Sequence, residues 1–427
     1  MTTRRLGVRL LWAACTAVLG LALPGVSARA HDEYSPCKQI MDREQWRACE
    51  YTHWRLHRCR EDWRSCGFGA LGDSQVDEYR GFSNMAGFNW LEQLARIRGL
   101  DFGAYQVDPT VRGEPRNSGY ARDWGRDAAS VTPPTWADLF LAWDLAGFCL
   151  ANFGSATCPG NGGHLQALGP FSAQVEGLAA QVSAGEVQIV VMMMGTNDFK
   201  IYQQYLGGTF SGPDWDRKSA DVVAGLLDAV DRLQAAGPVM MLVANIPSGG
   251  YGDVGNTAVD GVNAELAAAL ASRGVPMFDE YSFFYDSSLQ RVTPSPDGTF
   301  DVDLMVGSYA IPVVPWSVAS VYDLVSPDDP RAIGPCRLVG WQWQDPFSFS
   351  ETPMCATLEY ELNADLDDGM HISTLPGGLA ANVVLDALQK HFGLEIPLLR
   401  PNEILCSAGI ADPGRGHHHP GCAHDGR

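Results

Sequence analysis

The sequence predicts an α/β protein with three layers, α/β/α, in which a central parallel sheet lies between two layers of helices. Short, almost wholly apolar runs alternate with amphipathic stretches along the chain. Strands of a parallel sheet are buried on both faces, so they are apolar throughout, and a helix usually connects one to the next. The chain has 427 residues, of which 46% are hydrophobic and 19% are charged. This length and composition are sufficient to bury a large core.

Four short runs are the candidate strands of this sheet. They cover residues 68–72, 187–194, 239–244 and 275–278. In the segments between and after them, apolar residues recur with a period of about 3.6, which predicts helices packed on the sheet. The expected helices cover residues 89–98, 171–184, 220–236, 259–272 and 379–392. Because strands and helices alternate, we expect a parallel sheet that is covered on both faces.

Two parts of the chain do not follow this alternation. Residues 285–364 lack a clear period, so we expect a long irregular insertion, which in compact domains often acts as a lid or binding loop. Residues 396–427 are rich in Pro and Gly and contain the run His417-His418-His419. We interpret them as a solvated C-terminal tail, although the His run offers metal ligands.

Residues 1–30 have the pattern of a secretory signal peptide. Arg4, Arg5 and Arg9 give a positive start, residues 10–23 are apolar, and Ala28-Arg29-Ala30 offers a cleavage site. The apolar run is too short to cross a bilayer comfortably, and no later stretch reaches spanning length. We therefore expect a mature protein that is secreted or periplasmic, with no stable membrane span.

Cysteine usage agrees with export. Of the 11 Cys, only Cys15 lies in the signal segment, which leaves an even number that an oxidising compartment would pair. Proximity in the sequence suggests three pairs: Cys149 with Cys158, Cys336 with Cys355, and Cys406 with Cys422. Four further cysteines allow three connectivities, which stay open: Cys37, Cys49, Cys59 and Cys66. Zinc binding is the alternative, but the chain has no C-x-x-C motif.

Residues 31–66 form a Cys-rich N-terminal extension before the main domain, which we expect to cover residues 67–395 with the insertion inside it. The spacing of Trp46, Trp54 and Trp63 among charged residues predicts a helix, or a bent pair of helices, over residues 42–63. We expect these aromatic residues to pack on the main domain, since packing is a more common role than binding.

The net charge argues against anionic partners. Lys plus Arg is 30 and Asp plus Glu is 50, which gives a formal net charge of -20. A nucleic-acid binder needs a basic surface to neutralise phosphates, and an anionic membrane surface would repel this chain. We therefore expect neither nucleic acid nor an anionic membrane as a partner.

Three polar segments lie where the chemistry of a parallel α/β sheet is usually found, outside the carboxyl ends of the strands. They are Gly72-Asp73-Ser74, Gly195-Thr196-Asn197-Asp198 and, just before the last long helix, Asp368-Gly369-Met370-His371. Each alone is typical of a turn, a helix cap or a surface pair. Together they supply a hydroxyl nucleophile, a neutral hydrogen-bond donor, a base and an orienting acid.

In these three segments the sequence resembles the SGNH hydrolases, the GDSL-type esterase and lipase superfamily, over roughly residues 67–394. The resemblance implies a flavodoxin-like fold with Ser74 as the nucleophile and His371 and Asp368 as base and acid. It also implies that the side chain of Asn197 donates to the oxyanion, together with the backbone N–H of Ser74. Ser74 lies outside any G-x-S-x-G motif, which argues against the α/β-hydrolase fold.

The family's remaining segment, which contributes a backbone N–H from a Gly, matches less well. Alignment from Ala121 assigns this role to Gly125, with one extra residue before it, whereas alignment from Ser130 assigns it to Asp127. We prefer Gly125, because Gly lets a backbone approach the substrate closely. We interpret Asp73 and Asp198, which flank the other site residues, as acceptors for loop amides.

The predicted function is that of an exported serine esterase. His371 would take the proton of Ser74, Asp368 would orient the imidazole, and water would hydrolyse the acyl-enzyme. This chemistry requires no metal and no organic cofactor. The substrate stays open among acylated carbohydrates, lipids and small esters. The alternatives are an acyltransferase with the same acyl-enzyme and a non-catalytic exported carbohydrate-binding protein.

Overall fold

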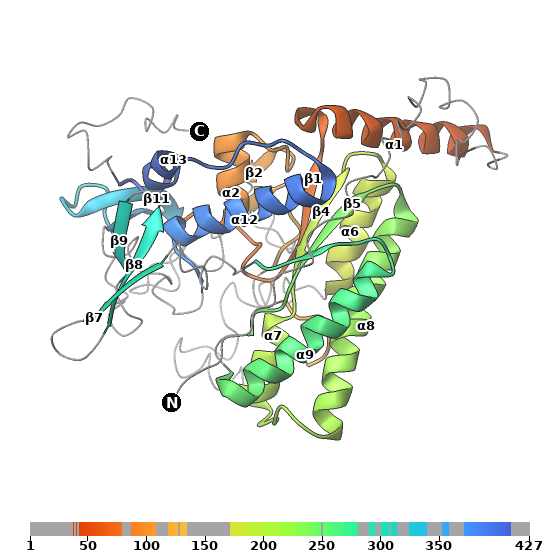
Figure 1. The fold of residues 1–427 in the computed structure, drawn as a ribbon. Helices are drawn as coiled ribbons and strands as arrows, with labels where there is room; N and C mark the ends of the chain where they lie inside the picture. The colour runs from red at the N-terminus through yellow and green to blue at the C-terminus, as the bar shows by residue number, and fades with distance from the viewer. Residues whose placement is uncertain are drawn as a thin grey trace, which may run out of the picture. The chain divides into compact units, whose positions relative to one another are not determined.

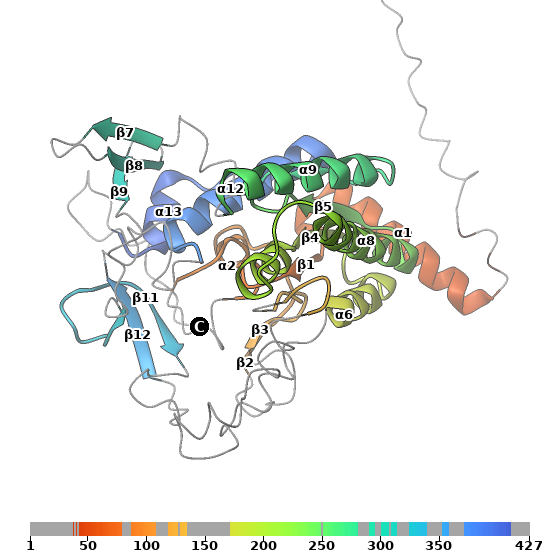
Figure 2. The same cartoon turned by 90° about the horizontal axis from the view of Figure 1, so that it is seen from below.

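The structure is a computed structural model. It describes residues 37, 40, 42–78, 87–107, 118–126, 129–134, 171–248, 251–280, 290–294, 300–306, 309–313, 324–339, 352–357 and 371–410. The chain divides into two compact units, Met1–Glu50 and Tyr51–Arg427. The ribbon is shown in Figures 1 and 2. Asp368, Asp127 and the signal segment lie outside the described residues, so the expectations about them stay predictions.

A parallel sheet of four strands forms the centre of the larger unit (Figure 1). Its strands are β1 (Phe68–Gly72), β4 (Ile189–Met193), β5 (Met240–Ala244) and β6 (Met277–Phe278), and they lie in that order across the sheet. All three neighbouring pairs are parallel, and the pairing of Phe68 with Ile189 and Ile189 with Met240 fixes their register. The four predicted strands are thus confirmed, within two residues at each end.

Side chains of successive residues in the strands enter two separate cores, one on each face of the sheet. Ile189, Val191 and Met193 belong to one core, while Val190 and Met192 belong to the other. Helices α2 (Trp90–Gln93), α12 (Thr374–Phe392) and α13 (Pro401–Ser407) cover the first face. Helices α6 (Phe171–Ser183), α8 (Pro213–Ala236) and α9 (Gly252–Ala271) cover the second. The structure therefore confirms the predicted three-layer α/β/α class.

Several helices begin earlier than their apolar pattern predicts. Helix α8 starts at Pro213 rather than at residue 220, and α12 starts at Thr374 rather than at residue 379. A proline fits the first turn of a helix because the N–H that it lacks has no partner there. Apolar periodicity marks only the part of a helix that packs, so it does not reveal such a polar or Pro-led first turn.

The predicted irregular insertion contains regular strands, so that expectation was wrong. One antiparallel sheet has the order β7 (Gln290–Pro294), β8 (Phe300–Val306), β9 (Tyr309–Val313). A second has the order β10 (Leu324–Val325), β12 (Thr352–Thr357), β11 (Ala332–Val339). Four of these strands contain a proline, at 294, 312, 335 and 353, and proline in a short run argues against a strand. Pairing between strands, which the sequence does not display, overrides that signal.

The start of the C-terminal tail is also packed, contrary to expectation. Leu399, Ile404 and Leu405 are buried in the core that contains α12. The Asn382 side chain on α12 accepts from the N–H of Leu399 at 2.6 Å and donates to the carbonyl of Leu399 at 3.0 Å. The Pro residues of this segment therefore lie in an ordered, packed stretch of chain and do not indicate a solvated tail. His417-His418-His419 lies outside the described residues.

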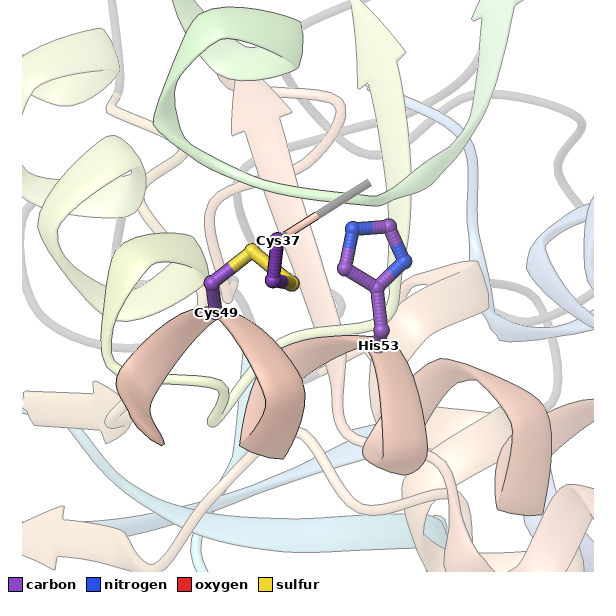
Figure 3. Close-up of side chains that lie close together, drawn as sticks. All are labelled: Cys37, Cys49 and His53. Atoms are coloured by element: carbon purple, nitrogen blue, oxygen red, sulfur yellow. A yellow bond between two sulfur atoms is a disulfide. The ribbon is translucent and has the colours of Figure 1, made fainter. Parts of the chain in front are cut away.

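The four N-terminal cysteines form two disulfides, which correspond to one of the three possible connectivities. Cys37 pairs with Cys49 (Figure 3), and Cys59 pairs with Cys66. Since both sulfur atoms of Cys37 and Cys49 are in a disulfide, neither is a thiolate ligand for a metal ion. The predicted pair Cys336–Cys355 is confirmed, and it links β11 to β12 where the two residues face each other. Cys406 is also disulfide-bonded, while Cys422, Cys149 and Cys158 lie outside the described residues.

Helix α1 (Arg43–Glu61) confirms the helix predicted for the extension. Its tryptophans are less packed than expected, because Trp46 and Trp54 are 40% and 51% exposed. Trp63, in the 3₁₀ turn that follows the helix, packs against the core as expected. In the part of the chain that the structure describes, no helix combines the length and the apolar composition needed to cross a membrane.

Candidate active site

Two of the three polar segments emerge side by side from the sheet. Gly72 at the end of β1 pairs in register with Met193 at the end of β4. The two chains stay hydrogen-bonded one residue beyond β1, where the N–H of Asp73 donates to the carbonyl of Met193 at 3.3 Å. Ser74 follows at once and is partly exposed, while Asn197 lies four residues beyond Met193, in α7 (Thr196–Lys200), and is 8% exposed. Both segments therefore lie at the same edge of the sheet, where β1 and β4 end.

Local geometry explains the residues that form the two loops. Gly195 has a φ of +119°, and a Cβ at this position would lie 2.8 Å from Cδ1 of Ile246. Only glycine meets both conditions without strain. In the first loop, the Asp73 carboxylate accepts from the N–H of Gln75 at 3.1 Å. This bond confirms that Asp73 holds a loop amide beside Ser74.

Asp198 holds a second loop, as predicted. Its carboxylate accepts from the N–H of Val131 at 2.8 Å and from the N–H of Thr132 at 3.0 Å. Lys218 on α8 neutralises the charge of this carboxylate, because its Nζ lies 3.1 Å from Oδ1 of Asp198. Both side chains are buried, so the pair is shielded from solvent. Sequence reasoning missed Lys218, because a single Lys in an amphipathic helix normally faces water.

The segment around Gly125 runs along the other side of β1. Ala70 donates its N–H to the carbonyl of Arg122 at 3.0 Å, and Trp124 donates its N–H to the carbonyl of Ala70 at 2.9 Å. Arg126 then donates its N–H to the carbonyl of Gly72 at 3.1 Å, which brings this segment to the same edge of the sheet.

Gly125 itself is closely surrounded by the residues that follow Ser74. A Cβ at Gly125 would lie 2.7 Å from the backbone N of Asp77 and 2.8 Å from Cβ of Val76. The N–H of Gly125 donates to Oδ1 of Asp123 at 2.8 Å. Gly125 is therefore required here by close packing, and its N–H already has a carboxylate acceptor. The predicted alternative, Asp127, lies outside the described residues.

His371 stands three residues before α12 and is buried, with 3% of its surface exposed. The start of α12 is hydrogen-bonded to α2 and to the segment just before it. The N–H of Phe88 donates to Oγ1 of Thr374 at 3.0 Å, and Nε2 of Gln93 donates to the Thr374 carbonyl at 2.7 Å. Residues immediately after His371 are thus anchored on α2.

The same end of α2 also holds the residues that follow Ser74. Trp90 donates its Nε1–H to the Gln75 carbonyl at 3.1 Å, and Asn89 donates its Nδ2–H to the Asp77 carbonyl at 2.8 Å. Asn89 and Glu92 also form a capping box, which fixes where this helix begins. The N-terminus of α2 is therefore a common support for the Ser74 loop and for the chain after His371.

A buried tyrosine faces the same edge of the sheet. Burial raises the pKa of the Tyr251 hydroxyl, and the negative charges of Asp73 and Asp198 raise it further. The hydroxyl donates to the carbonyl oxygen of Thr196, so Tyr251 contacts the segment that follows β4 and carries Asn197. Sequence reasoning missed it, because Tyr251 follows a Gly-Gly pair and resembles an ordinary loop residue.

No family model and no curated protein match the chain. Among solved structures, it is similar to a member of the lipolytic protein G-D-S-L family from Veillonella parvula DSM 2008. That similarity has a TM-score of 0.28 and a sequence identity of 16%, and it covers 52% of this chain and 82% of the other.

Proposed function

We propose that the protein is an exported serine esterase in which Ser74 is the nucleophile, His371 the base and Asp368 the acid that orients it. The observation that carries this proposal is the shared support of the site. The Ser74 loop and the Asn197 loop leave paired positions of β1 and β4. The Ser74 loop and the chain after His371 are both hydrogen-bonded to the start of α2. Such rigid support is what a preorganised catalytic group requires.

The reaction follows from these groups. His371 accepts the proton of the Ser74 hydroxyl as its oxygen attacks the ester carbonyl carbon. The tetrahedral intermediate collapses, the C–O bond to the alcohol breaks, and the imidazolium returns the proton to the leaving oxygen. Water then attacks the acyl-enzyme by the same route. Asp368 keeps the imidazole in the tautomer that can accept from Ser74.

Negative charge develops on the carbonyl oxygen during both steps, and hydrogen-bond donors must stabilise it. The side chain of Asn197 and the backbone N–H of Ser74 are two of the three donors we assign. Gly125 is the third. Its N–H donates to Asp123 in this structure, so a substrate oxyanion would have to replace that carboxylate as the acceptor.

Export is supported by the disulfides Cys59–Cys66 and Cys336–Cys355, since structural disulfides occur mainly in oxidising compartments. Sequencing the N-terminus of the mature protein tests this part directly. A start near residue 31 is expected, and a start at Met1 would contradict it.

Labelling with a fluorophosphonate tests the catalytic proposal, because only an activated serine reacts. The wild type and the exposed control Ser211→Ala should be labelled, whereas Ser74→Ala and His371→Ala should not. Label retained in folded Ser74→Ala would contradict the assignment, and an unlabelled wild type would favour a binding protein. A panel of acetylated sugars, lipid esters and short acyl esters then identifies the substrate class.

A further inference from the structure

Tyr251 precedes α9 and is almost fully buried, with 6% of its surface exposed. Its ring packs against Phe210, with the ring centroids 5.3 Å apart. Its hydroxyl donates to the carbonyl oxygen of Thr196 at 3.3 Å. Thr196 is the first residue of α7 and immediately precedes Asn197, so the bond acts on the backbone that carries the Asn197 carboxamide.

A second bond connects Tyr251 to the same helical segment. Nε2 of Gln203 donates to the carbonyl oxygen of Tyr251 at 3.3 Å. Gln203 lies in η5 (Ile201–Tyr205), the π-helical turn that continues α7. Tyr251 therefore holds this segment at two points, one before Asn197 and one after it.

The electrostatic surroundings keep the Tyr251 hydroxyl a donor. Burial is the main cause that raises its pKa, and the negative charges of Asp73 and Asp198 act in the same direction. The hydroxyl stays protonated throughout the pH range in which a serine esterase works. Its hydrogen bond to Thr196 is thus independent of pH there.

We propose that Tyr251 is a positioning residue that fixes Asn197 in the orientation needed to donate to the developing oxyanion. This inference rests on the esterase proposed above. Tyr251 contacts the backbone next to Asn197 and acts through it, without a role in proton transfer. Because an oxyanion donor matters most in the transition state, loss of its support should lower kcat and leave KM nearly unchanged.

Tyr251→Phe removes the hydroxyl and keeps the ring. One hydrogen bond of ordinary strength corresponds to about a two- to tenfold loss of kcat. Tyr202→Phe is the matched control, since Tyr202 is also buried and its hydroxyl donates to a backbone carbonyl, that of Thr209, at 3.0 Å. Both variants should lose similar thermal stability, but only Tyr251→Phe should lose kcat.

Coupling to Asn197 separates positioning from general loosening of the fold. In an Asn197→Ala background, Tyr251→Phe should cause no further loss of kcat. The inference is overturned if the two losses multiply, if Tyr202→Phe lowers kcat equally, or if Tyr251→Phe keeps the wild-type kcat. A wild type without esterase activity overturns the proposed function and this inference together, whereas an active wild type with a fully active Tyr251→Phe overturns only the inference.

Discussion

Asn197 donates a hydrogen bond from Nδ2 to the carbonyl oxygen of Ala129 at 2.9 Å. The bond connects α7 to the loop that contains Val131 and Thr132, which Asp198 holds through their amides. An Asn side chain has two Nδ2–H donors, and this bond uses one of them. It also restrains the plane of the carboxamide and therefore the direction of the second N–H.

The role of Asn197 is tested by Asn197→Ala. We expect kcat to fall by about 10²–10³ with little change in KM, because an oxyanion donor acts mainly on the transition state. Asn382→Ala is the matched control, since Asn382 on α12 likewise donates from Nδ2 to a backbone carbonyl, that of Leu399. Steady-state kinetics on the folded variants measure kcat and KM, and only Asn197→Ala should lose kcat. A change confined to KM in Asn197→Ala would make Asn197 a substrate-binding residue instead.

Gly125 should not tolerate a methyl group. In Gly125→Ala the new Cβ would press on Val76 and Asp77, and overpacking of this kind costs about 1–3 kcal/mol of the free energy of unfolding. Gly261→Ala is the control, because a Cβ at Gly261 in α9 meets no atom within 4 Å. That change should stabilise the helix by roughly 0.5–1 kcal/mol. Urea denaturation measures both, and equal stability of Gly125→Ala and wild type would contradict the packing argument.

Removal of the buried cation should destabilise the fold strongly. Lys218→Met leaves the Asp198 carboxylate buried without its ion partner, and breaking a buried pair costs about 3–5 kcal/mol. The adjacent Arg217 forms an ion pair with Asp214 in which both side chains are mostly exposed. Arg217→Met should therefore change the free energy of unfolding by at most about 1 kcal/mol. Similar unfolding free energies for the two variants would show that the Lys218 pair is not structurally important.

The stability contributed by Glu403 should depend on pH. Burial alone raises the pKa of Glu403, but hydrogen bonds from Arg98 and Arg400 outweigh it and lower the pKa to about 2. A carboxyl whose pKa is lower in the folded state stabilises the fold above its ordinary value of 4.5, and this contribution is lost as the pH falls from there towards about 2. Glu403→Gln should thus be less stable than wild type at pH 7.

The difference between Glu403→Gln and wild type should shrink as the pH is lowered below 4.5, the ordinary pKa of the group. Chemical denaturation at several pH values measures it. Glu395→Gln, at an exposed position in the same segment, serves as the control and should show a much smaller effect. A difference for Glu403→Gln that is constant with pH would rule out the ion-pair explanation.

The sequence by itself determined the elements whose signals are local. The apolar run at 189–193 has to be buried on both faces, and the amphipathic residues of α8 have to cover a sheet. Their alternation was sufficient to predict the parallel sheet and the edge at which Ser74 and Asn197 emerge. The pairing of Cys336 with Cys355 could also be predicted, because the two residues are close in the chain.

Only the tertiary structure decided the features that depend on pairing between distant segments. Four of the strands from β7 to β12 contain a proline, and their sheets exist because neighbouring strands satisfy each other's backbone groups. Lys218 and Tyr251 carry no local signal either. Each becomes informative only when the fold brings it against Asp198 or Thr196, away from water, where an unpaired charge or hydroxyl would be costly. Local patterns fix which residues must be buried, whereas the partners of buried polar groups are fixed by three-dimensional proximity.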